Sequence, residues 1–534
     1  MEKIKNIIND CRGMDYHEII DCLIESRGIK NIDNFLNPTI DDLLPLDSLY
    51  RIDEARNIVV DGINNNLHFK VLFDTDTDGV MSGTQITRWL LNFTKNVDYR
   101  INQGKSHGIQ NKDLDWYKDC DILIIVDSLD SDNIKYKNIY ESGTKIIILD
   151  HHSIKDEIDY DTYTTLVSSN RKYENPQLSG AGVVWKFCKY LDEYMGTDYA
   201  NNLMDLATCG IIADMSDMSE KSMENRYICN NGLNNLVNLG LKKIIGSYEF
   251  NSTAVSFSIA SLVNACNRVN KNELAVSLFM SDDKKEVSKL VKELQECKIL
   301  QNEEVDRILP DIIESLDKQN GKVLYTIIDT DYGIGGLIGN KLLERYQKPL
   351  LILKDTGKSY AGSCRAIGLD DFKAMCSETG LCKADGHELA FGIEIRKDKF
   401  DNFIKSINDK LNNVEFVNKK DIDLLLNIED VSPSLVTYIK NLEKVSGTGF
   451  SRITVEIDNV TDYEISSFKD GKHLVIKNPY VTFIEWNTSC DYDDMEDNSM
   501  LETPINFIGS LDSGFLARKF ILKMIIDEYE VQNE

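Results

Sequence analysis

The chain is poor in the features that mark membrane proteins, secreted proteins and zinc ribbons. Its longest apolar runs have the length of a β-strand, whereas a membrane-spanning helix needs about 20 consecutive apolar residues. Residues 1–6 contain no apolar core of a signal peptide. None of the 12 cysteines lies in a C-x-x-C pair, which disfavours a zinc ribbon and a disulfide framework. We therefore expect a soluble, cytoplasmic protein that does not associate with membranes.

Positive charge is also scarce. The 60 Lys and Arg residues are outnumbered by 88 Asp and Glu residues, which gives a formal net charge of −28 at pH 7. Because phosphate contacts require Lys and Arg, this balance argues against a protein whose whole surface binds nucleic acid. It does not exclude a local basic groove on an acidic body, and bound metal ions would offset part of the carboxylate charge.

The length of 534 residues is too great for a single hydrophobic core. From about residue 69 to 239, strand-like apolar runs alternate with amphipathic stretches, which predicts βαβ units and a doubly wound parallel sheet. A long helix follows, and Pro310 is expected to kink or restart it. We predict an α/β multidomain protein with five segments: a helical segment packed on the catalytic lobe (1–68), a doubly wound catalytic domain (69–284), a connecting helix (285–320), a second α/β domain (321–418) and a C-terminal β-barrel (419–534).

Acidic residues follow three of the apolar runs directly. The runs end at Phe73, Val126 and Leu149, and the last is followed by two adjacent histidines, although the chain has only seven histidines. In a parallel sheet the carboxyl ends of neighbouring strands form one ligand-binding edge. Capping of the following helix could explain any single acid, but it does not require several carboxylates and two imidazoles together. The residues concerned are Asp74, Asp76, Asp78, Asp127, Asp150, His151 and His152.

Carboxylates this close repel one another unless cations lie between them. Mn²⁺ accepts mixed carboxylate and imidazole ligands, and two divalent ions about 3.5–4 Å apart can clamp a phosphoryl group during displacement. We therefore predict two bound divalent ions, with Mn²⁺ expected and Mg²⁺ as the alternative. Adjacent side chains of an extended segment point to opposite faces, so His151 and His152 can serve different tasks.

At these residues the chain resembles the DHH phosphoesterase superfamily. The matching motifs are Asp74 to Gly79, Asp127, the Asp-His-His of residues 150–152, and Leu206 to Asp214. The resemblance implies that Asp127 bridges two metal ions and that His152 touches metal or substrate phosphate. It also implies that Asp74 is a weaker ligand and that Asp150 orients a histidine. The remaining ligands implied are Asp76, Asp78, His151 and Asp214.

Within the superfamily the chain is most similar to the RecJ family of single-strand-specific 5′→3′ exonucleases. Residues 362–365 and 385–392 resemble the substrate-binding motifs of the DHH-associated domain, and the C-terminal strands lie where that family carries an OB-fold. The resemblance implies that Ser363 and Arg365 hold the DNA 5′-phosphate, that Gly386 also binds substrate, and that His387 reaches the scissile phosphate. Arg100 aligns with a further phosphate-binding arginine. A surface ion pair for Arg365 and a loop position for His387 are the structural alternatives.

The chain departs from the family pattern at three places. Phe73 stands where glycine is usual, Asp385 replaces the first glycine of a Gly-Gly-His motif, and the segment after Gly104 lacks Gly-Tyr-Gly. None of these changes removes a metal ligand. They affect the expected DNA affinity and the preferred substrate length, since Asp385 places a negative charge near the proposed phosphate site.

The resemblance implies a monomeric hydrolase for DNA repair and recombination that degrades single-stranded DNA from the 5′ end to nucleoside 5′-monophosphates by two-metal catalysis. A single-strand-binding protein or a helicase would be a natural partner. One alternative is a phosphodiesterase for very short RNA or cyclic dinucleotides. Another is an inactive DNA-binding scaffold relative, which the net charge of −28 favours and the complete ligand set disfavours.

Overall fold

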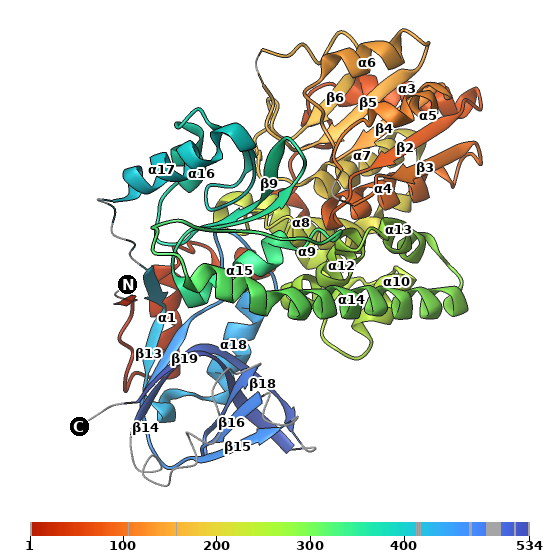
Figure 1. The fold of residues 1–534 in the computed structure, drawn as a ribbon. Helices are drawn as coiled ribbons and strands as arrows, with labels where there is room; N and C mark the ends of the chain where they lie inside the picture. The colour runs from red at the N-terminus through yellow and green to blue at the C-terminus, as the bar shows by residue number, and fades with distance from the viewer. Residues whose placement is uncertain are drawn as a thin grey trace.

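The described part of the chain contains three large β-sheets, a two-stranded sheet and a long helix that connects the first two lobes. The computed structural model describes residues 3–104, 106–155, 157–412, 414, 416, 418–468, 473–486, 504–516 and 519–531. In Figure 1 the first α/β lobe lies at the upper right, the second α/β lobe at the left, and the C-terminal sheet below them. Among the described residues, no helix combines the length and apolar character needed to cross a membrane.

The first sheet is parallel throughout and has the strand order β3-β2-β4-β5-β6. Its side chains alternate between two hydrophobic clusters, so that Val71 packs with helices on one face and Leu72 with helices on the other. This arrangement confirms the predicted doubly wound sheet. The strands are β2 (Phe69–Phe73), β3 (Val97–Ile101), β4 (Ile122–Val126), β5 (Lys145–Asp150) and β6 (Thr165–Ser168). The covering helices are α3 (Ile52–Asn64), α4 (Thr77–Leu90) and α7 (Gly180–Met195) on one face, and α5 (Leu114–Lys118) and α6 (Asn133–Tyr140) on the other.

A helical layer completes this lobe and leads into the connecting helix α14 (Lys284–Asp317). The helix does not restart at Pro310, because α14 continues through that residue as one helix of 34 residues. Ile308 and Ile312, on either side of the proline, are buried in the core of the second lobe, and this packing offsets the backbone hydrogen bond that proline cannot donate. The layer consists of α8 (Met204–Ala213), α9 (Met223–Asn234), α10 (Leu239–Ile245), α11 (Ser252–Ala254), a π-helical turn (Val255–Ala260), α12 (Ser261–Arg268) and α13 (Asn272–Met280).

The second lobe is a mixed sheet with the order β10-β11-β9-β8-β7. Only β7 and β8 are parallel to each other, and the other neighbours are antiparallel. Helix α15 (Gly335–Tyr346) packs on one face, and α16 (Phe372–Ser377) and α17 (Phe400–Leu411) pack on the other. The strands are β7 (Leu324–Ile327), β8 (Leu350–Asp355), β9 (Ser359–Arg365), β10 (Cys382–Gly386) and β11 (Ala390–Arg396).

The C-terminal region forms a seven-stranded sheet with the order β13-β14-β18-β19-β17-β16-β15. No pairing joins β13 to β15 among the described strands, so the predicted OB-like barrel is not confirmed. Alternating apolar residues predict that strands form, but they carry no information on whether the two edge strands meet. The elements are β13 (Leu424–Leu426), α18 (Pro433–Glu443), β14 (Val455–Val460), β15 (Glu464–Phe468), β16 (His473–Lys477), β17 (Val481–Trp486), β18 (Ile505–Leu516) and β19 (Lys519–Val531).

The N-terminal segment begins with a strand, which the prediction of a helical segment missed. Strand β1 (Lys3–Ile7) pairs in parallel with β12 (Asn418–Ile422), more than 400 residues away along the chain. A strand of only five residues has too few positions to show a clear alternating pattern, and its partner is too distant in the sequence to suggest the pairing. Helices α1 (Tyr16–Ser26) and α2 (Ile32–Leu36) follow it. The red N-terminal segment and the blue C-terminal region therefore lie together in Figure 1.

Candidate metal centre

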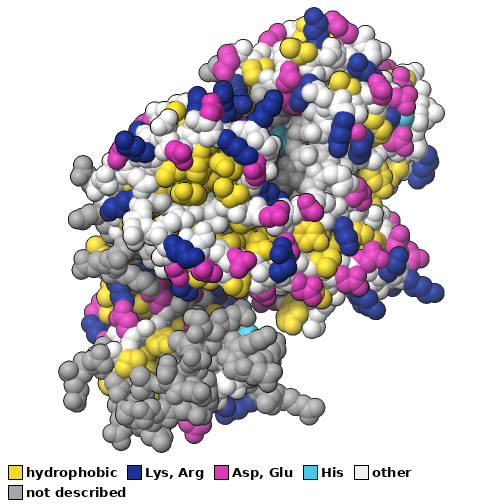
Figure 2. Space-filling model, viewed as in Figure 1, with side chains coloured by type: hydrophobic (Ala, Val, Ile, Leu, Met, Phe, Trp, Pro, Cys, Tyr) yellow, Lys and Arg dark blue, Asp and Glu magenta, His cyan; other side chains and the backbone are white. Residues whose placement is uncertain are grey.

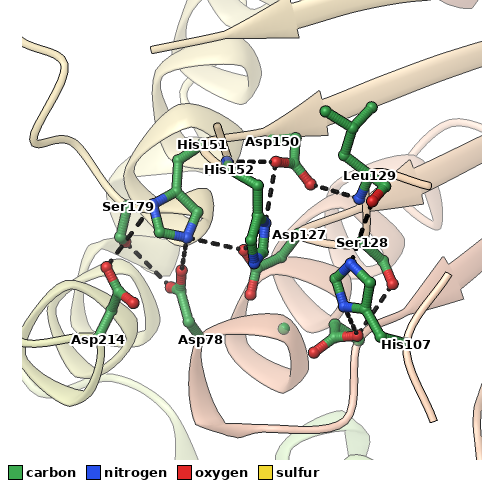
Figure 3. Close-up of polar contacts among 12 residues, drawn as sticks. Asp78, His107, Asp127, Ser128, Leu129, Asp150, His151, His152, Ser179 and Asp214 are labelled. Atoms are coloured by element: carbon green, nitrogen blue, oxygen red, sulfur yellow. Dashed lines mark hydrogen bonds and ion pairs between the residues drawn. The ribbon is translucent and has the colours of Figure 1, made fainter. Parts of the chain in front are cut away.

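The register of the first sheet brings its strand ends together. Phe73 of β2 pairs with Val126 of β4, and Val126 pairs with Leu149 of β5. The next residue of each strand is an aspartate, so Asp74, Asp127 and Asp150 leave the sheet side by side. The sequence predicted this convergence, and Figure 3 shows the resulting cluster.

Three overlapping groups of side chains could each hold a metal ion. Within each group, the potential ligand atoms all lie within 4.8 Å of one another. Asp127 belongs to two of these groups and His151 also belongs to two. The structure therefore brings together all seven side chains that the sequence predicted as metal ligands. The groups are Asp127 with His151 and His152, Asp78 with His151 and Asp214, and Asp74 with Asp76 and Asp127.

Helix ends hold the carboxylates in place. Asp76 caps α4 by accepting the N–H of Gly79, and Asp78 lies in the first turn of that helix. The hydroxyl of Ser179 and the N–H of Ala181 both donate to Oδ1 of Asp78, each at 3.0 Å. These bonds leave Oδ2 of Asp78 without a hydrogen-bond partner, and Oδ1 of Asp127 is likewise buried without one.

The two adjacent histidines have different surroundings (Figure 3). Nε2 of His151 lies 3.2 Å from Oδ1 of Asp127, and its Nδ1 lies 3.7 Å from Oδ2 of Asp214. His152 directs Nδ1 to Oδ1 of Asp150 at 3.0 Å. The other oxygen of Asp150 accepts the N–H of Leu129 at 2.9 Å, so Asp150 fixes the ring of His152 relative to the sheet.

The charges of this cluster do not balance without cations. Burial and the neighbouring carboxylate of Asp76 raise the pKa of Asp78 to about 6, and burial with Asp78 and Asp76 raises the pKa of Asp127 well above its usual value. Asp150 differs, because His152 and His151 lower its pKa even though burial alone would raise it. Buried carboxylates with unpartnered oxygens and raised pKa values fit a divalent cation, which would satisfy both the charge and the oxygens.

His107 is a site residue that the sequence analysis missed. Its Nδ1 lies 2.9 Å from Oδ1 of Asp74, and the hydroxyl of Ser128 donates to the same oxygen at 2.9 Å. Its ring contacts that of His152 edge to face, with centroids 5.0 Å apart. His107 follows the edge strand β3 and lies in the segment where the expected Gly-Tyr-Gly is absent. Two features of the sequence could have indicated His107 as a site residue: its position in this segment, and the fact that the chain has only seven histidines.

The proposed phosphate-binding residues lie in the second lobe. Ser363, Arg365, Asp385 and Gly386 line one cavity of about 470 Å³. Arg365 donates to Oδ1 of Asn340 at 2.7 Å and makes no ion pair among the described residues, so the surface ion pair considered for it is not observed.

Arg268, on α12, was also missed by the sequence analysis. Burial and the nearby charge of Arg365 lower the pKa of Arg268. Its guanidinium donates to Oε1 of Gln301 at 2.8 Å, and its carbonyl accepts the N–H of Gly333, which lines the same cavity as Arg365.

Two predicted residues lie apart from the carboxylate cluster. Arg100 makes an ion pair with Asp113 at 2.9 Å and lines a separate cavity of about 270 Å³ beside β3. His387 lies in the turn between β10 and β11, where its backbone exchanges hydrogen bonds with that of Ala390. Neither belongs to a group of potential metal ligands among the described residues.

Comparisons with known proteins agree with this geometry. Residues 69–211 match the family model described as "DHH family, N-terminal domain". The chain is 28% identical over 504 residues to YorK of Bacillus subtilis (strain 168), a prophage-derived protein whose name describes it as a proposed single-strand DNA-specific exonuclease, and the match covers 85% of this chain and 84% of YorK. It is 25% identical over 452 residues to the single-stranded-DNA-specific exonuclease RecJ of the same organism, covering 79% of this chain and 56% of that protein.

Solved structures show the same fold. RecJ of Thermus thermophilus in complex with Mn²⁺ superposes with a TM-score of 0.80 at 19% sequence identity, covering 99% of this chain and 80% of that one. The Mg²⁺ complex of the same protein gives a TM-score of 0.73. The strand-end carboxylates and the Asp-His-His segment lie within the residues 69–211 that match the DHH family model, which shows that this part of the chain is a DHH-family N-terminal domain.

Proposed function

We propose that the protein is a metal-dependent phosphodiesterase that degrades single-stranded DNA from its 5′ end and releases nucleoside 5′-monophosphates. The observation that carries this proposal is the convergence of seven potential metal ligands on one edge of the first sheet. The cavity with Arg365 in the second lobe supplies a site for a terminal phosphate. The names of YorK and RecJ describe this substrate class for those relatives.

The ligand set fits two divalent ions. Asp78, His151 and Asp214 would hold one ion, and Asp74 with Asp76 would hold the other. Asp127 would be shared, because it belongs to two of the three overlapping groups. Bound Mn²⁺ or Mg²⁺ would supply Lewis-acid activation of the phosphodiester and a nucleophilic water at neutral pH.

The other polar residues hold these ligands in place. Ser179 and the N–H of Ala181 orient Asp78, and Asp150 keeps His152 directed toward the reacting phosphate. Arg365 and Arg268 would bind the 5′-phosphate. The number of nucleotides that fit between this phosphate site and the carboxylate cluster would then determine which phosphodiester bond is cut. We also propose that His387 contacts the scissile phosphate, which requires its turn to approach the cluster when DNA binds.

Local positive charge would compensate for the acidity of the whole chain. In Figure 2, Lys and Arg side chains gather on the rim of the hollow between the two upper lobes, and a histidine is visible within it. One end of the second sheet also carries a cavity of about 850 Å³ lined by five basic residues, namely Lys358, Lys383, Arg396, Lys397 and Lys399. Such groups can contact the backbone of a single strand while the rest of the surface stays acidic.

A nuclease assay with oligonucleotides labelled at either end tests the proposal. With Mn²⁺ present, the single strand should yield mononucleotides together with long fragments that keep the 3′ label, because cleavage begins at the 5′ end. Blunt duplexes should stay intact, and EDTA should abolish cleavage. Cleavage confined to dinucleotides or cyclic dinucleotides would instead support the small-substrate alternative. Binding of DNA with neither cleavage nor binding of Mn²⁺ would support the scaffold alternative.

Replacement of Arg365 by glutamine should weaken recognition of the 5′-phosphate specifically. Hydrogen bonds to charged groups contribute about 1.5–3 kcal/mol, so we expect KM for a 5′-phosphorylated strand to rise about tenfold to a hundredfold. KM for the same strand with a 5′-hydroxyl should change less than about threefold. Arg345→Gln, which removes an exposed arginine of α15 that pairs with Asp317, is the matched control. Equal effects of Arg365→Gln on both strands would contradict the assignment.

A further inference from the structure

The segment that follows Asp214 is held by parts of the chain that lie far away in the sequence. Asp214 ends α8, and the next residue, Met215, has a left-handed backbone with φ of 59°. Ser216 then turns back, donating its N–H to the carbonyl of Ile211 and its hydroxyl to Oδ2 of Asp214, each at 3.2 Å. The position of the Asp214 carboxylate therefore depends on where residues 215–218 are anchored.

A loop of the C-terminal region, residues 445–450, provides one anchor. The N–H of Met218 donates to the carbonyl of Thr448 at 2.8 Å, and Asp217 forms a β-bridge with the same residue. The contact leaves no free space at Gly449, where a Cβ atom would lie 2.0 Å from Oδ1 of Asp217. This glycine also has φ of 72°, a conformation that other residues rarely adopt.

Arg226 fastens this loop to the segment. Its side chain is only 2% exposed, and one guanidinium nitrogen, Nη1, donates to the carbonyls of both Met218 and Val445 at 3.0 Å. Nε donates to the carbonyl of Phe35 in the N-terminal segment, also at 3.0 Å. No carboxylate pairs with Arg226 among the described residues. The guanidinium also lies over the ring of Phe35, 3.4 Å from its centroid, so three carbonyls and an aromatic face hold this buried cation and fix the segments that supply them relative to one another.

We propose that Arg226 is a positioning residue for Asp214. It holds the carbonyl of Met218 against the C-terminal loop, and Ser216 transmits that position to the carboxylate. The C-terminal region is then part of the support of the metal centre, in addition to any contact it makes with DNA. This inference rests on the proposed function insofar as Asp214 is taken as a metal ligand.

The test compares Arg226→Met with Arg27→Met in the full-length protein. Arg27 joins the same N-terminal and C-terminal regions, through Asp423 at 2.6 Å and the ring of Phe450, but it does not touch residues 214–218. Both variants should lower thermal stability, whereas only Arg226→Met should disturb the segment after Asp214. In the metal-free protein we expect amide hydrogen exchange at residues 216–218 to quicken at least about tenfold in Arg226→Met and less than about twofold in Arg27→Met.

Calorimetric titration with Mn²⁺ gives the second measurement. Loss of an outer-shell partner commonly weakens metal binding by about tenfold to a hundredfold, and we expect this range for Arg226→Met, partial recovery in Arg226→Lys, and no change beyond about twofold in Arg27→Met. Equal exchange or equal Mn²⁺ affinity in the two methionine variants would overturn the inference. If the wild type binds Mn²⁺ but cleaves no DNA, the proposed function fails while the inference is still decided by these two measurements. If the wild type binds no Mn²⁺, both the metal role and the inference are refuted.

Discussion

Replacement of Asp127 by asparagine should reduce the rate of DNA hydrolysis by about a thousandfold or more. Asp127 belongs to two of the three groups of potential metal ligands, so its change would affect both proposed ion sites at once. A neutral amide is a weaker ligand for a hard divalent cation than a carboxylate. In the proposed two-ion mechanism, loss of a ligand that both ions share would impair hydrolysis more than loss of a ligand to one ion. Single-turnover hydrolysis of a labelled single strand at saturating Mn²⁺ is the measurement.

The same variant should not be less stable than the wild type. Oδ1 of Asp127 is buried without a hydrogen bond, although Nε2 of His151 lies 3.2 Å away, and burial together with the carboxylates of Asp78 and Asp76 raises the pKa of Asp127. Removing that charge relieves repulsion in the metal-free protein, so the unfolding temperature should stay equal or rise. Asp205→Asn is the matched control, because Asp205 is buried on α8 and accepts only backbone N–H groups. It should lower stability and keep activity within about threefold. More than about 1% of wild-type turnover in Asp127→Asn would refute the shared-ligand role.

The catalytic edge of the first sheet could be predicted because its geometry is local. A fully apolar run of three to five residues predicts a buried strand, and an acid immediately after the run must emerge at the strand end. The parallel register of Phe73, Val126 and Leu149 then places three acids side by side with no further information needed. Asp214 came from the resemblance instead, since a helix end carries no comparable signal.

The residues that the sequence analysis missed make contacts with residues that lie far from them in the sequence. His107 reaches Asp74 from the segment after an edge strand, and Arg268, on a helix of the first lobe, accepts the N–H of Gly333 in the second lobe through its carbonyl. Nothing in the spacing of these residues relates them to their partners, because the contacts depend on how lobes and loops are packed. The phosphate contact of Arg100, which its place in the motif order suggested, stays a prediction. In the structure its guanidinium pairs with Asp113.

Small residues where α7 packs against α8 determine the position of the Asp78 carboxylate, one of the proposed metal ligands. Oδ1 of Asp78 receives hydrogen bonds from Ser179 and Ala181 of α7, while Gly210 of α8 lies against the same oxygen. A Cβ atom on Gly210 would lie 2.4 Å from Oδ1 of Asp78 and 2.3 Å from Cβ of Ala181. Either the two helices separate or the carboxylate moves, and both changes displace a proposed ligand.

Replacement of Gly210 by alanine should therefore lower both stability and metal affinity. Helix propensity alone would stabilise the protein by about 1 kcal/mol, so a net loss of about 1–3 kcal/mol in the free energy of unfolding would report the overpacked contact. We expect Mn²⁺ affinity to fall about tenfold and kcat/KM to fall about a hundredfold, since the displaced carboxylate acts in both binding and catalysis. Thermal unfolding, Mn²⁺ titration and hydrolysis of a labelled single strand provide the three readouts.

Gly232→Ala separates this effect from general overpacking. Gly232 lies on α9, where a Cβ atom would meet Oγ1 of Thr208 at 2.0 Å and the carbonyl of Met204 at 2.5 Å. The clash is at least as severe and also involves α8, but it does not touch Asp78. Stability should therefore fall in both variants, while Mn²⁺ affinity should stay within about twofold of the wild type only in Gly232→Ala. If both variants lose stability and neither loses Mn²⁺ affinity, Asp78 is not a ligand whose position the packing of α7 and α8 determines.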